Sequence, residues 1–510
     1  MIRARLVAGV LACTVLAPAC GQKPGVHQPV TQVAAAPPIA PEEPVAASQP
    51  EAASPAAPAA AGPSAAPAPS AAPRTTAAAG STPVPSGPGD RTGVSEREIV
   101  IGFHAPLTGA ASVPLTDIQA GKDVYWRWLA SKGATIHGRG VRVVYRDDQY
   151  NPSHAVSVCR EMVEKEKVFF LLGGAGTDQI LACARYANSV GVPYLSAGVT
   201  EGVVKSFRSY FAVSATYPQQ AGVVAQFVKS GAPEALGANG YQGGAILADR
   251  CPDGGGGLLA GCKVGAQPAG ASAKVAVVYS DTEGFFDARD AFKSAYGAAV
   301  EDKPITKFAI SEAEASALIQ DLKGKGVDVV FILTSPENWL RILRVAQLQS
   351  YLPRWVGVGL TMGIGTVATA ACVQSRDAFQ YSLFLNPWFS VLHPDAAQFS
   401  DAWRTVGGDQ NPQGHDIAFG LWGLSTVEHV LLEAAGQDLS RESLVAAAER
   451  LRGATASGTI KALPIKDVFS RLTYAPGRHF GADQSHLLWA DCRGLGTWNY
   501  LVNGQFRSGF

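Results

Sequence analysis

The sequence lacks three features that would place it in well-known classes of protein. Its basic and acidic residues balance at 42 each, so it has no concentrated positive charge of the kind that binds nucleic acid. Its nine histidines are scattered, and no cysteine pair or cysteine–histidine cluster has zinc-ligand spacing. No apolar run reaches the roughly 20 residues needed to cross a bilayer. We therefore expect no nucleic-acid partner, no metal, no other cofactor and no transmembrane helix.

Motifs of common catalytic sites are also missing. Ser196 is not part of a G-x-S-x-G turn, because Tyr194 stands two residues before it. Neither H-E-x-x-H nor a phosphate-binding loop occurs, since the glycine-rich stretch 254–263 lacks the lysine–hydroxyl ending. Asp147 and Asp148 are adjacent on a predicted strand and point to opposite faces, which favours loop hydrogen bonding over an acid–base pair. The sequence does not favour an enzyme.

The N-terminus predicts export. Arg3 and Arg5 precede an apolar core over residues 6–15 and the small-residue segment Leu16-Ala17-Pro18-Ala19-Cys20. This ending resembles a bacterial lipobox, with Ala17 where leucine is usual. We expect residues 1–20 to be a lipoprotein signal peptide, with lipid on Cys20 anchoring the chain outside the cell membrane. Ordinary signal cleavage near Ala19 is the alternative.

Residues 21–93 consist mainly of Ala, Pro, Ser and Thr. With almost no large apolar side chains to bury, this segment cannot fold alone. As a coil it would span roughly 50 Å on average, which suits a disordered tether. A low-complexity tract without a selected length is the alternative.

Apolar runs and amphipathic helices then alternate, which is the pattern of a parallel α/β sheet. In the first half we expect strands over 99–103, 141–145, 168–172, 193–196 and 210–214, in a doubly wound sheet of order 2-1-3-4-5. After a glycine-rich insertion at 231–273, the same alternation resumes, with strands expected over 274–279, 305–310 and 327–333.

The segments IGFHAPLTG, RDDQYNPSHA, LLGGAGTDQ and VGVPYLSAGVT occur in an order and spacing that resemble the branched-chain amino-acid-binding family of type I periplasmic solute-binding proteins of ABC transporters. The resemblance runs from about Val94 to the C-terminus. It implies two doubly wound parallel-sheet lobes joined by a three-strand hinge, with the ligand between them. We expect lobe one over 94–215 and 386–488, and lobe two over 216–385 and 489–510.

In lobe one, Ala175, Gly176 and Thr177 join the third strand to a helix. The Thr177 hydroxyl and N–H would face an anion at the positive end of that helix, with a plain N-cap as the alternative. In the resembled family, a serine at this place binds the ligand carboxylate, and a threonine matches Thr200. The family's ammonium is held partly by the backbone carbonyl at the Gly198 position. Ser196, at the end of the expected strand 193–196, completes the lobe-one half of the ligand site.

Lobe two supplies the other half of the expected site. Phe285 or Phe286 would form an aromatic wall, and Thr334 and Ser335 stand where the family commonly has a tyrosine. Gly359 stands where the family has an acid for the ammonium. The site therefore favours a carboxylate, an amide or an aromatic compound over a leucine-like zwitterion, unless one of three nearby acids replaces the missing one: Asp281, Glu283 or Glu337.

Six cysteines remain after the signal peptide and Cys20 are set aside. Export permits disulfides. Cys251 and Cys262 would close a glycine-rich loop, and Cys159 and Cys183 lie on helices expected side by side. Cys372 and Cys492 then pair by elimination.

The sequence predicts an extracytoplasmic, lipid-anchored monomer that captures a small polar ligand and delivers it to ABC permease subunits. A receptor that senses ligand and signals to a membrane partner without transport is an alternative, and an enzyme is a third. Neighbouring genes would separate the first two, because permeases with ATPases favour transport and a lone histidine kinase favours sensing.

Overall fold

The computed structural model describes residues 89–109, 115–230, 273–297, 299–306, 309–359, 365–380, 382–386, 396–407, 409–412, 415–469, 471–481, 484–492, 497–500 and 507–508. The expected signal peptide, Cys20, the tether up to residue 88, the glycine-rich insertion up to residue 272 and the pair Cys251 and Cys262 lie outside these ranges. Within them, no helix has both the length and the hydropathy to span a bilayer.

The first sheet has five parallel strands in the order β2-β1-β3-β4-β5, as the sequence predicts. Their bounds are β1 Glu98–Ala105, β2 Gly140–Asp147, β3 Phe170–Gly173, β4 Tyr194–Ser196 and β5 Tyr210–Ala212. Side chains alternate between the two faces of a strand. On β1, Ile99 and Ile101 therefore pack in one core and Val100 packs in the core on the opposite face.

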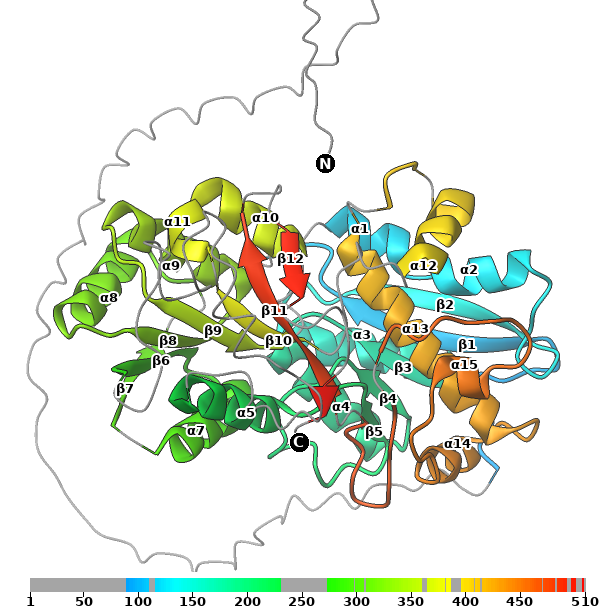
Figure 1. Ribbon diagram of the computed structural model, residues 1–510. Coiled ribbons are helices and arrows are strands. Elements are labelled where there is room, and N and C mark those ends of the chain that lie inside the picture. Colours follow the sequence, from blue (N-terminus) through cyan, green and yellow to red (C-terminus); the bar gives the residue numbers. More distant parts are fainter. Residues whose placement is uncertain are drawn as a thin grey trace, which may run out of the picture. The chain divides into compact units, whose positions relative to one another are not determined.

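Helices cover both faces of this sheet (Figure 1). On one face lie α3 (Pro152–Glu164) and α4 (Thr177–Ser189). Asn151 caps α3 by accepting a hydrogen bond from the His154 backbone N–H. The opposite face packs against segments from both ends of the chain: α1 Leu115–Gly121, α2 Val124–Ser131, α12 Ala397–Ala402, the π-helix Trp403–Gly407, α13 Asp416–Ala435, α14 Arg441–Ala448 and α15 Ala456–Thr459.

The second sheet has the order β12-β11-β10-β9-β8-β6-β7, with β13 pairing β11. Its strands are β6 Val275–Ser280, β7 Val300–Ile305, β8 Val329–Leu333, β9 Arg354–Val358, β10 Leu383–Asn386, β11 Gln484–Asp491, β12 Thr497–Tyr500 and β13 Arg507–Ser508. The strands from β6 to β10 run parallel, and β11 is antiparallel to both β10 and β12. The fold is therefore α/β, with two mainly parallel sheets.

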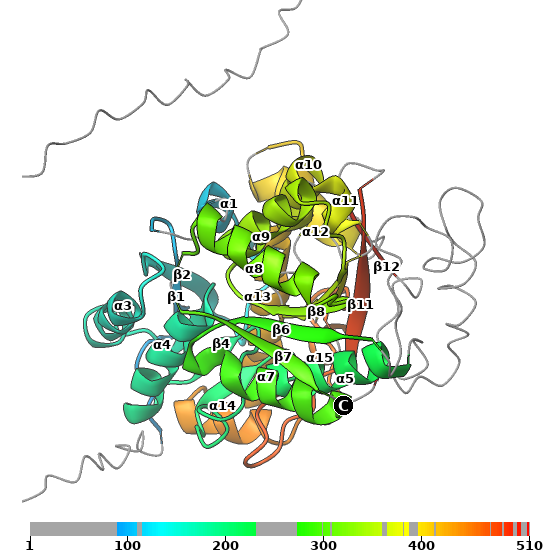
Figure 2. The ribbon, with the colours of Figure 1, turned by 90° about the vertical axis from the view of Figure 1, so that its left-hand side faces the viewer.

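Helices also cover both faces of the second sheet (Figure 2). One face packs against α8 Glu312–Gly324, α9 Pro336–Leu348, α10 Gly365–Gln374 and α11 Arg376–Phe379. The other packs against α5 Tyr217–Ser230 and α7 Glu283–Tyr296. Ser311 and Glu314 form a capping box at the start of α8, and the Ser335 hydroxyl caps α9.

Two expectations differ from the structure. The strand expected over 305–310 is β7 at Val300–Ile305, which lies at the sheet edge. Three consecutive charged residues, 301–303, follow Val300, so this strand lacks the apolar run that marks a buried strand. The last crossing between lobes comes before Gln484 rather than near Trp489, because all of β11 pairs in the second sheet. Phe480 still pairs with Ala212 of the first sheet.

Two disulfides lie within the described residues. Cys159 and Cys183 join α3 to α4, and Cys372 and Cys492 join α10 to the residue after β11, as expected from the sequence. His104 lies near the first pair. Because those sulfurs are bonded to each other, they do not offer thiolates to a metal.

Candidate ligand site between the two sheets

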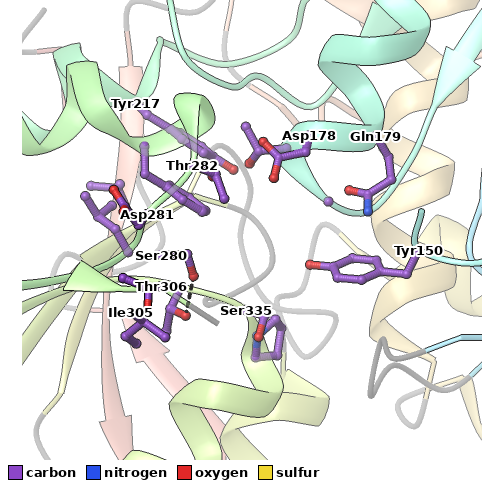
Figure 3. A pocket seen from close by; sticks show the side chains of 17 residues that line it. Tyr150, Asp178, Gln179, Tyr217, Ser280, Asp281, Thr282, Ile305, Thr306 and Ser335 are labelled. Carbon is purple, nitrogen blue, oxygen red and sulfur yellow. Dashed lines mark hydrogen bonds between the residues drawn. The ribbon is translucent and has the colours of Figure 1, made fainter. Parts of the chain in front are cut away.

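A cavity of about 290 Å³ lies at the carboxyl ends of strands from both sheets (Figure 3). From lobe one it is lined by Tyr150, Gly176, Thr177, Asp178 and Gln179. From lobe two it is lined by Tyr217, Ser280, Asp281, Thr282, Phe285, Ile305, Thr306, Leu333, Thr334, Ser335, Pro336 and Val358. Four of these residues end β6, β7, β8 and β9. Strand ends of an open α/β sheet are where ligands bind, and this volume suits a small molecule.

The N-terminus of α4 faces the cavity. Its N-cap, Gly176, has no side chain, so no side chain caps the first turn. Thr177 is 8% exposed, and it lines the cavity together with Tyr217. Burial raises the pKa of Tyr217 to about 12, so the phenol stays protonated at neutral pH. Hydroxyl groups and the positive end of a helix dipole thus meet at this wall.

The charged side chains that line the described cavity are both acidic. Asp178 points toward Gly284 at the start of α7, with Oδ1 3.2 Å from where a Gly284 Cβ would lie. Burial, reinforced by Glu283, raises the pKa of Asp178. Asp281 is exposed and lies at the edge of the cavity. No lysine, arginine or histidine joins these two in the lining.

The other two acids considered from the sequence have partners elsewhere. Glu283 forms an ion pair with Arg185 at 2.6 Å, and Glu337 lies 3.3 Å from Arg341 on its own helix. Of the three candidate replacements for the missing acid, Asp281 is therefore the one that lines the cavity.

Five of the residues expected at the site line the cavity: Gly176, Thr177, Phe285, Thr334 and Ser335. The Thr334 hydroxyl lies 2.7 Å from that of Ser280, which links the ends of β8 and β6. The Ser335 hydroxyl accepts from the Asn338 backbone N–H as the N-cap of α9. Phe285 lies parallel to Tyr217, with ring centroids 6.3 Å apart.

The other expected residues lie away from the lining. Ala175 directly precedes the lining residue Gly176 in the same loop. Ser196 is buried and lies 2.6 Å from the Tyr210 hydroxyl, and a side chain on Gly198 would collide with Ser214. Phe286 packs edge-on against Tyr279. These contacts stabilise the loops around the cavity.

The space beside Gly359 is filled by a neighbouring side chain. Its φ is +91°, a conformation that favours glycine, and a Cβ there would lie 2.8 Å from the Tyr217 ring. The tyrosine therefore fills the space that a side chain at position 359 would need.

Residues 98–467 match the periplasmic binding protein family. The chain belongs to this family. No curated protein sequence matches it significantly. Proteins of this family bind solutes and are not enzymes, in agreement with the absence of catalytic motifs.

Several solved structures share the fold of this periplasmic binding protein. A branched-chain amino-acid ABC transporter protein from Thermus thermophilus with bound valine is 16% identical, with a TM-score of 0.59 over 80% of this chain and 96% of that one. A solute-binding protein from R. palustris in complex with 4-hydroxybenzoate is 18% identical, with a TM-score of 0.58 over 81% and 97%. A fatty-acid ABC transporter substrate-binding protein from Thermomonospora curvata is 17% identical, with a TM-score of 0.57 over 82% and 95%.

Helix α7 of lobe two is hydrogen-bonded to lobe one beside the cavity. Asp287 Oδ2 accepts hydrogen bonds from the Thr200 hydroxyl, from the Glu201 N–H at 2.7 Å and from the Gly202 N–H at 3.0 Å. We call this contact between Asp287 and residues 200–202 the interlobe clasp. Thr200, expected to bind ligand, is 1% exposed and donates to Asp287 instead.

Sequence reasoning missed the two tyrosines of the cavity. Tyr150 follows β2, so the rule that strand ends bind ligands could have found it. Tyr217 begins α5, directly after the chain crosses from lobe one. It is not at a strand end, and no local pattern marks it.

Proposed function

We propose that this chain is an extracytoplasmic solute-binding protein that captures a small, amino-acid-like ligand between its lobes and delivers it to an ABC importer. The observation that carries the proposal is the cavity, whose lining comes from both lobes and from the carboxyl ends of both sheets. A ligand that contacts both lobes stabilises the closed form, which is the form a permease can distinguish from the empty one.

The charges of the cavity favour one class of ligand. The lining has two carboxylates and no cation, so a simple carboxylate anion would face unfavourable charge. The anionic group of a zwitterion could instead bind at Thr177 and the α4 N-terminus, with its ammonium toward Asp281. An uncharged amide could use the same hydroxyls. Zwitterionic or amide ligands are therefore favoured over an aromatic acid.

Calorimetry of the purified mature protein tests this choice with L-valine, L-glutamine and 4-hydroxybenzoate. We expect one of the two amino acids to bind at least tenfold more tightly than 4-hydroxybenzoate. Thr177→Val should weaken that binding by about 1–3 kcal/mol through a lost hydrogen bond. Thr405→Val is the control, because Thr405 is exposed on the π-helix and donates only to the Asp401 carbonyl. Preference for 4-hydroxybenzoate would contradict the charge argument.

We further propose that the protein acts as a monomer held at the membrane by lipid on Cys20. The basic start, short apolar core and small residues before Cys20 support the lipid anchor. Cys20→Ser should move the protein from the membrane fraction to the soluble fraction and abolish labelling by radioactive palmitate. A Cys20→Ser protein that stays in the membrane fraction, together with an unlabelled wild type, would refute the anchor.

A further inference from the structure

The loop that carries Tyr150 has an unusual backbone. Gln149 and Tyr150 both have positive φ, at +54° and +52°, a region that non-glycine residues avoid. Such residues persist only where their surroundings hold them in place, and they gather at functional sites. Tyr150 lines the cavity, where its phenol points inward (Figure 3). The absent side chain of Gly176 makes room for its ring, since a Cβ there would lie 2.7 Å from Tyr150 Cε2.

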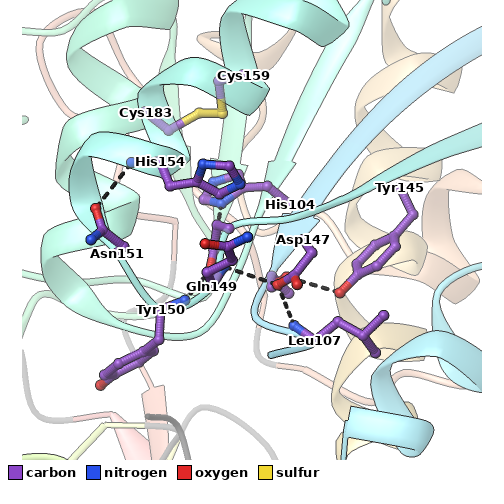
Figure 4. A network of polar contacts seen from close by, with 12 residues as sticks. His104, Leu107, Tyr145, Asp147, Gln149, Tyr150, Asn151, His154, Cys159 and Cys183 are labelled. Atoms are coloured by element: carbon purple, nitrogen blue, oxygen red, sulfur yellow. Dashed lines mark hydrogen bonds and ion pairs between the residues drawn. A yellow bond between two sulfur atoms is a disulfide. The ribbon is translucent and has the colours of Figure 1, made fainter. Parts of the chain in front are cut away.

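A buried polar network lies directly behind this loop (Figure 4). Asp148 Oδ1 accepts from the Tyr150 backbone N–H at 2.9 Å, and Asp148 Oδ2 lies 2.8 Å from His104 Nδ1. His104 Nε2 lies 2.7 Å from the Tyr194 hydroxyl. The Asp148 and His104 side chains are fully buried, and Tyr194 is 1% exposed.

The network is complete in one arrangement of protons. Tyr194 donates to His104 Nε2, His104 donates through Nδ1 to Asp148, and Asp148 accepts from Tyr150. Each buried polar atom in the series then has a partner, as burial requires. The end of β3 leaves space for it, since a side chain on Gly173 would collide with both Tyr194 and His104.

We propose that Tyr150 is a specificity-determining residue of the ligand site and that Asp148, His104 and Tyr194 are its positioning residues. The proposal rests on the proposed function, because it assigns a role at the same cavity. The network links Tyr150 to strand β4, and neither His104 nor Tyr194 lines the cavity. The role of the network is thus to fix the direction of the Tyr150 phenol by holding the Tyr150 backbone in place.

The positioning role has a test that needs no ligand. Tyr194→Phe removes one hydroxyl from the network, and Tyr210→Phe is the matched control. Tyr210 is equally buried, lies on the neighbouring strand β5 and loses one hydroxyl contact, to Ser196. Both variants should lower the melting temperature similarly. With 3-fluorotyrosine placed at position 150, the ¹⁹F spectrum should show one sharp resonance in the wild type and Tyr210→Phe, and a shifted or broadened one in Tyr194→Phe. An unchanged spectrum in Tyr194→Phe would overturn the positioning role.

The specificity role is tested by native mass spectrometry after incubation with an equimolar mixture of the twenty amino acids and 4-hydroxybenzoate. We expect Tyr150→Phe to lose about tenfold in retention of the compound that the wild type selects, or to select another. Tyr186→Phe, which changes a tyrosine of α4 outside the lining, should behave as the wild type. Equal selection by wild type and Tyr150→Phe would overturn this role. If the wild type retains nothing, the proposed ligand class and the specificity role both fail, while the fluorine spectra still decide the positioning role.

Discussion

Asp287→Ala should open the protein without unfolding it. One carboxylate oxygen of Asp287 accepts three hydrogen bonds from the opposite lobe, through the Thr200 hydroxyl and the N–H groups of Glu201 and Gly202. These contacts exist only when the lobes are together. Their loss therefore acts on the equilibrium between open and closed forms rather than on the stability of either lobe.

The size of the effect follows from the number and exposure of these bonds. A hydrogen bond to a charged group contributes about 1.5–3 kcal/mol, but the three donors share one oxygen and Gly202 is exposed to water. We therefore expect a total of about 2–3 kcal/mol, which is about 30- to 150-fold in the open-to-closed ratio. The neighbouring pair Arg185–Glu283 is about half exposed on both sides and contributes at most about 1 kcal/mol. The clasp thus dominates at this edge of the cavity.

Single-molecule energy transfer measures the ratio directly, with dyes at the exposed positions Lys132 in lobe one and Gln320 in lobe two. Asp290→Ala is the matched control, because Asp290 is exposed on the same helix and pairs with the adjacent Arg289 within lobe two. Asp287→Ala should enrich the low-transfer form and leave the melting temperature within the range of the control. Equal transfer distributions in the two variants would refute the clasp.

Two further predictions concern stability. Replacing Cys372 and Cys492 by serine should lower the unfolding free energy by about 5 kcal/mol, and replacing Cys159 and Cys183 by about 3.5 kcal/mol, because the two sequence separations are 120 and 24. Urea denaturation that ranks the two double variants in reverse would contradict the chain-entropy reasoning. Glu428 in α13 is fully buried, neither of its oxygens has a hydrogen-bond partner in the described part of the chain, and burial raises the pKa of its carboxyl well above 4.5. The unfolded chain therefore loses this proton first, so the unfolding free energy of the wild type relative to Glu428→Gln should fall as the pH rises above about 4.5; a constant difference between about pH 5 and pH 8 would show that this carboxyl does not titrate differently on folding.

The sequence predicted the first sheet well because most of its strands are short apolar runs that alternate with amphipathic helices, and the order of a doubly wound sheet follows from such alternation. It predicted β7 poorly, because this edge strand is partly exposed to solvent. The polar residues of Val300–Ile305 suit that exposure but do not mark a strand in the sequence. Expected site residues that follow strand ends reached the cavity from both sheets: Gly176 and Thr177 after β3, and Thr334 and Ser335 after β8.

Contacts between the lobes were beyond sequence reasoning. Thr200 follows a strand in lobe one, so considered by itself it is a sound candidate for binding ligand. The partner that receives its hydroxyl, Asp287, comes from a helix of the other lobe. Which residues meet there depends on how the lobes close, and no local pattern encodes that. Tyr150 is a different case: its place after β2 could have pointed to the cavity, but its positive φ could not be predicted, because it contradicts ordinary backbone preferences.

Gly359 shows how a correct local reading can still lead to an incomplete conclusion. The absence of an acid there first argued against an ammonium-bearing ligand. In the folded chain, the missing side chain leaves space for the Tyr217 ring, which lies parallel to that of Phe285. On the lobe-two side of the cavity, a carboxylate comes from Asp281, after the end of β6. Tyr217 and Asp281 thus line the same cavity from lobe two, and this arrangement supports the proposed amino-acid-like ligand.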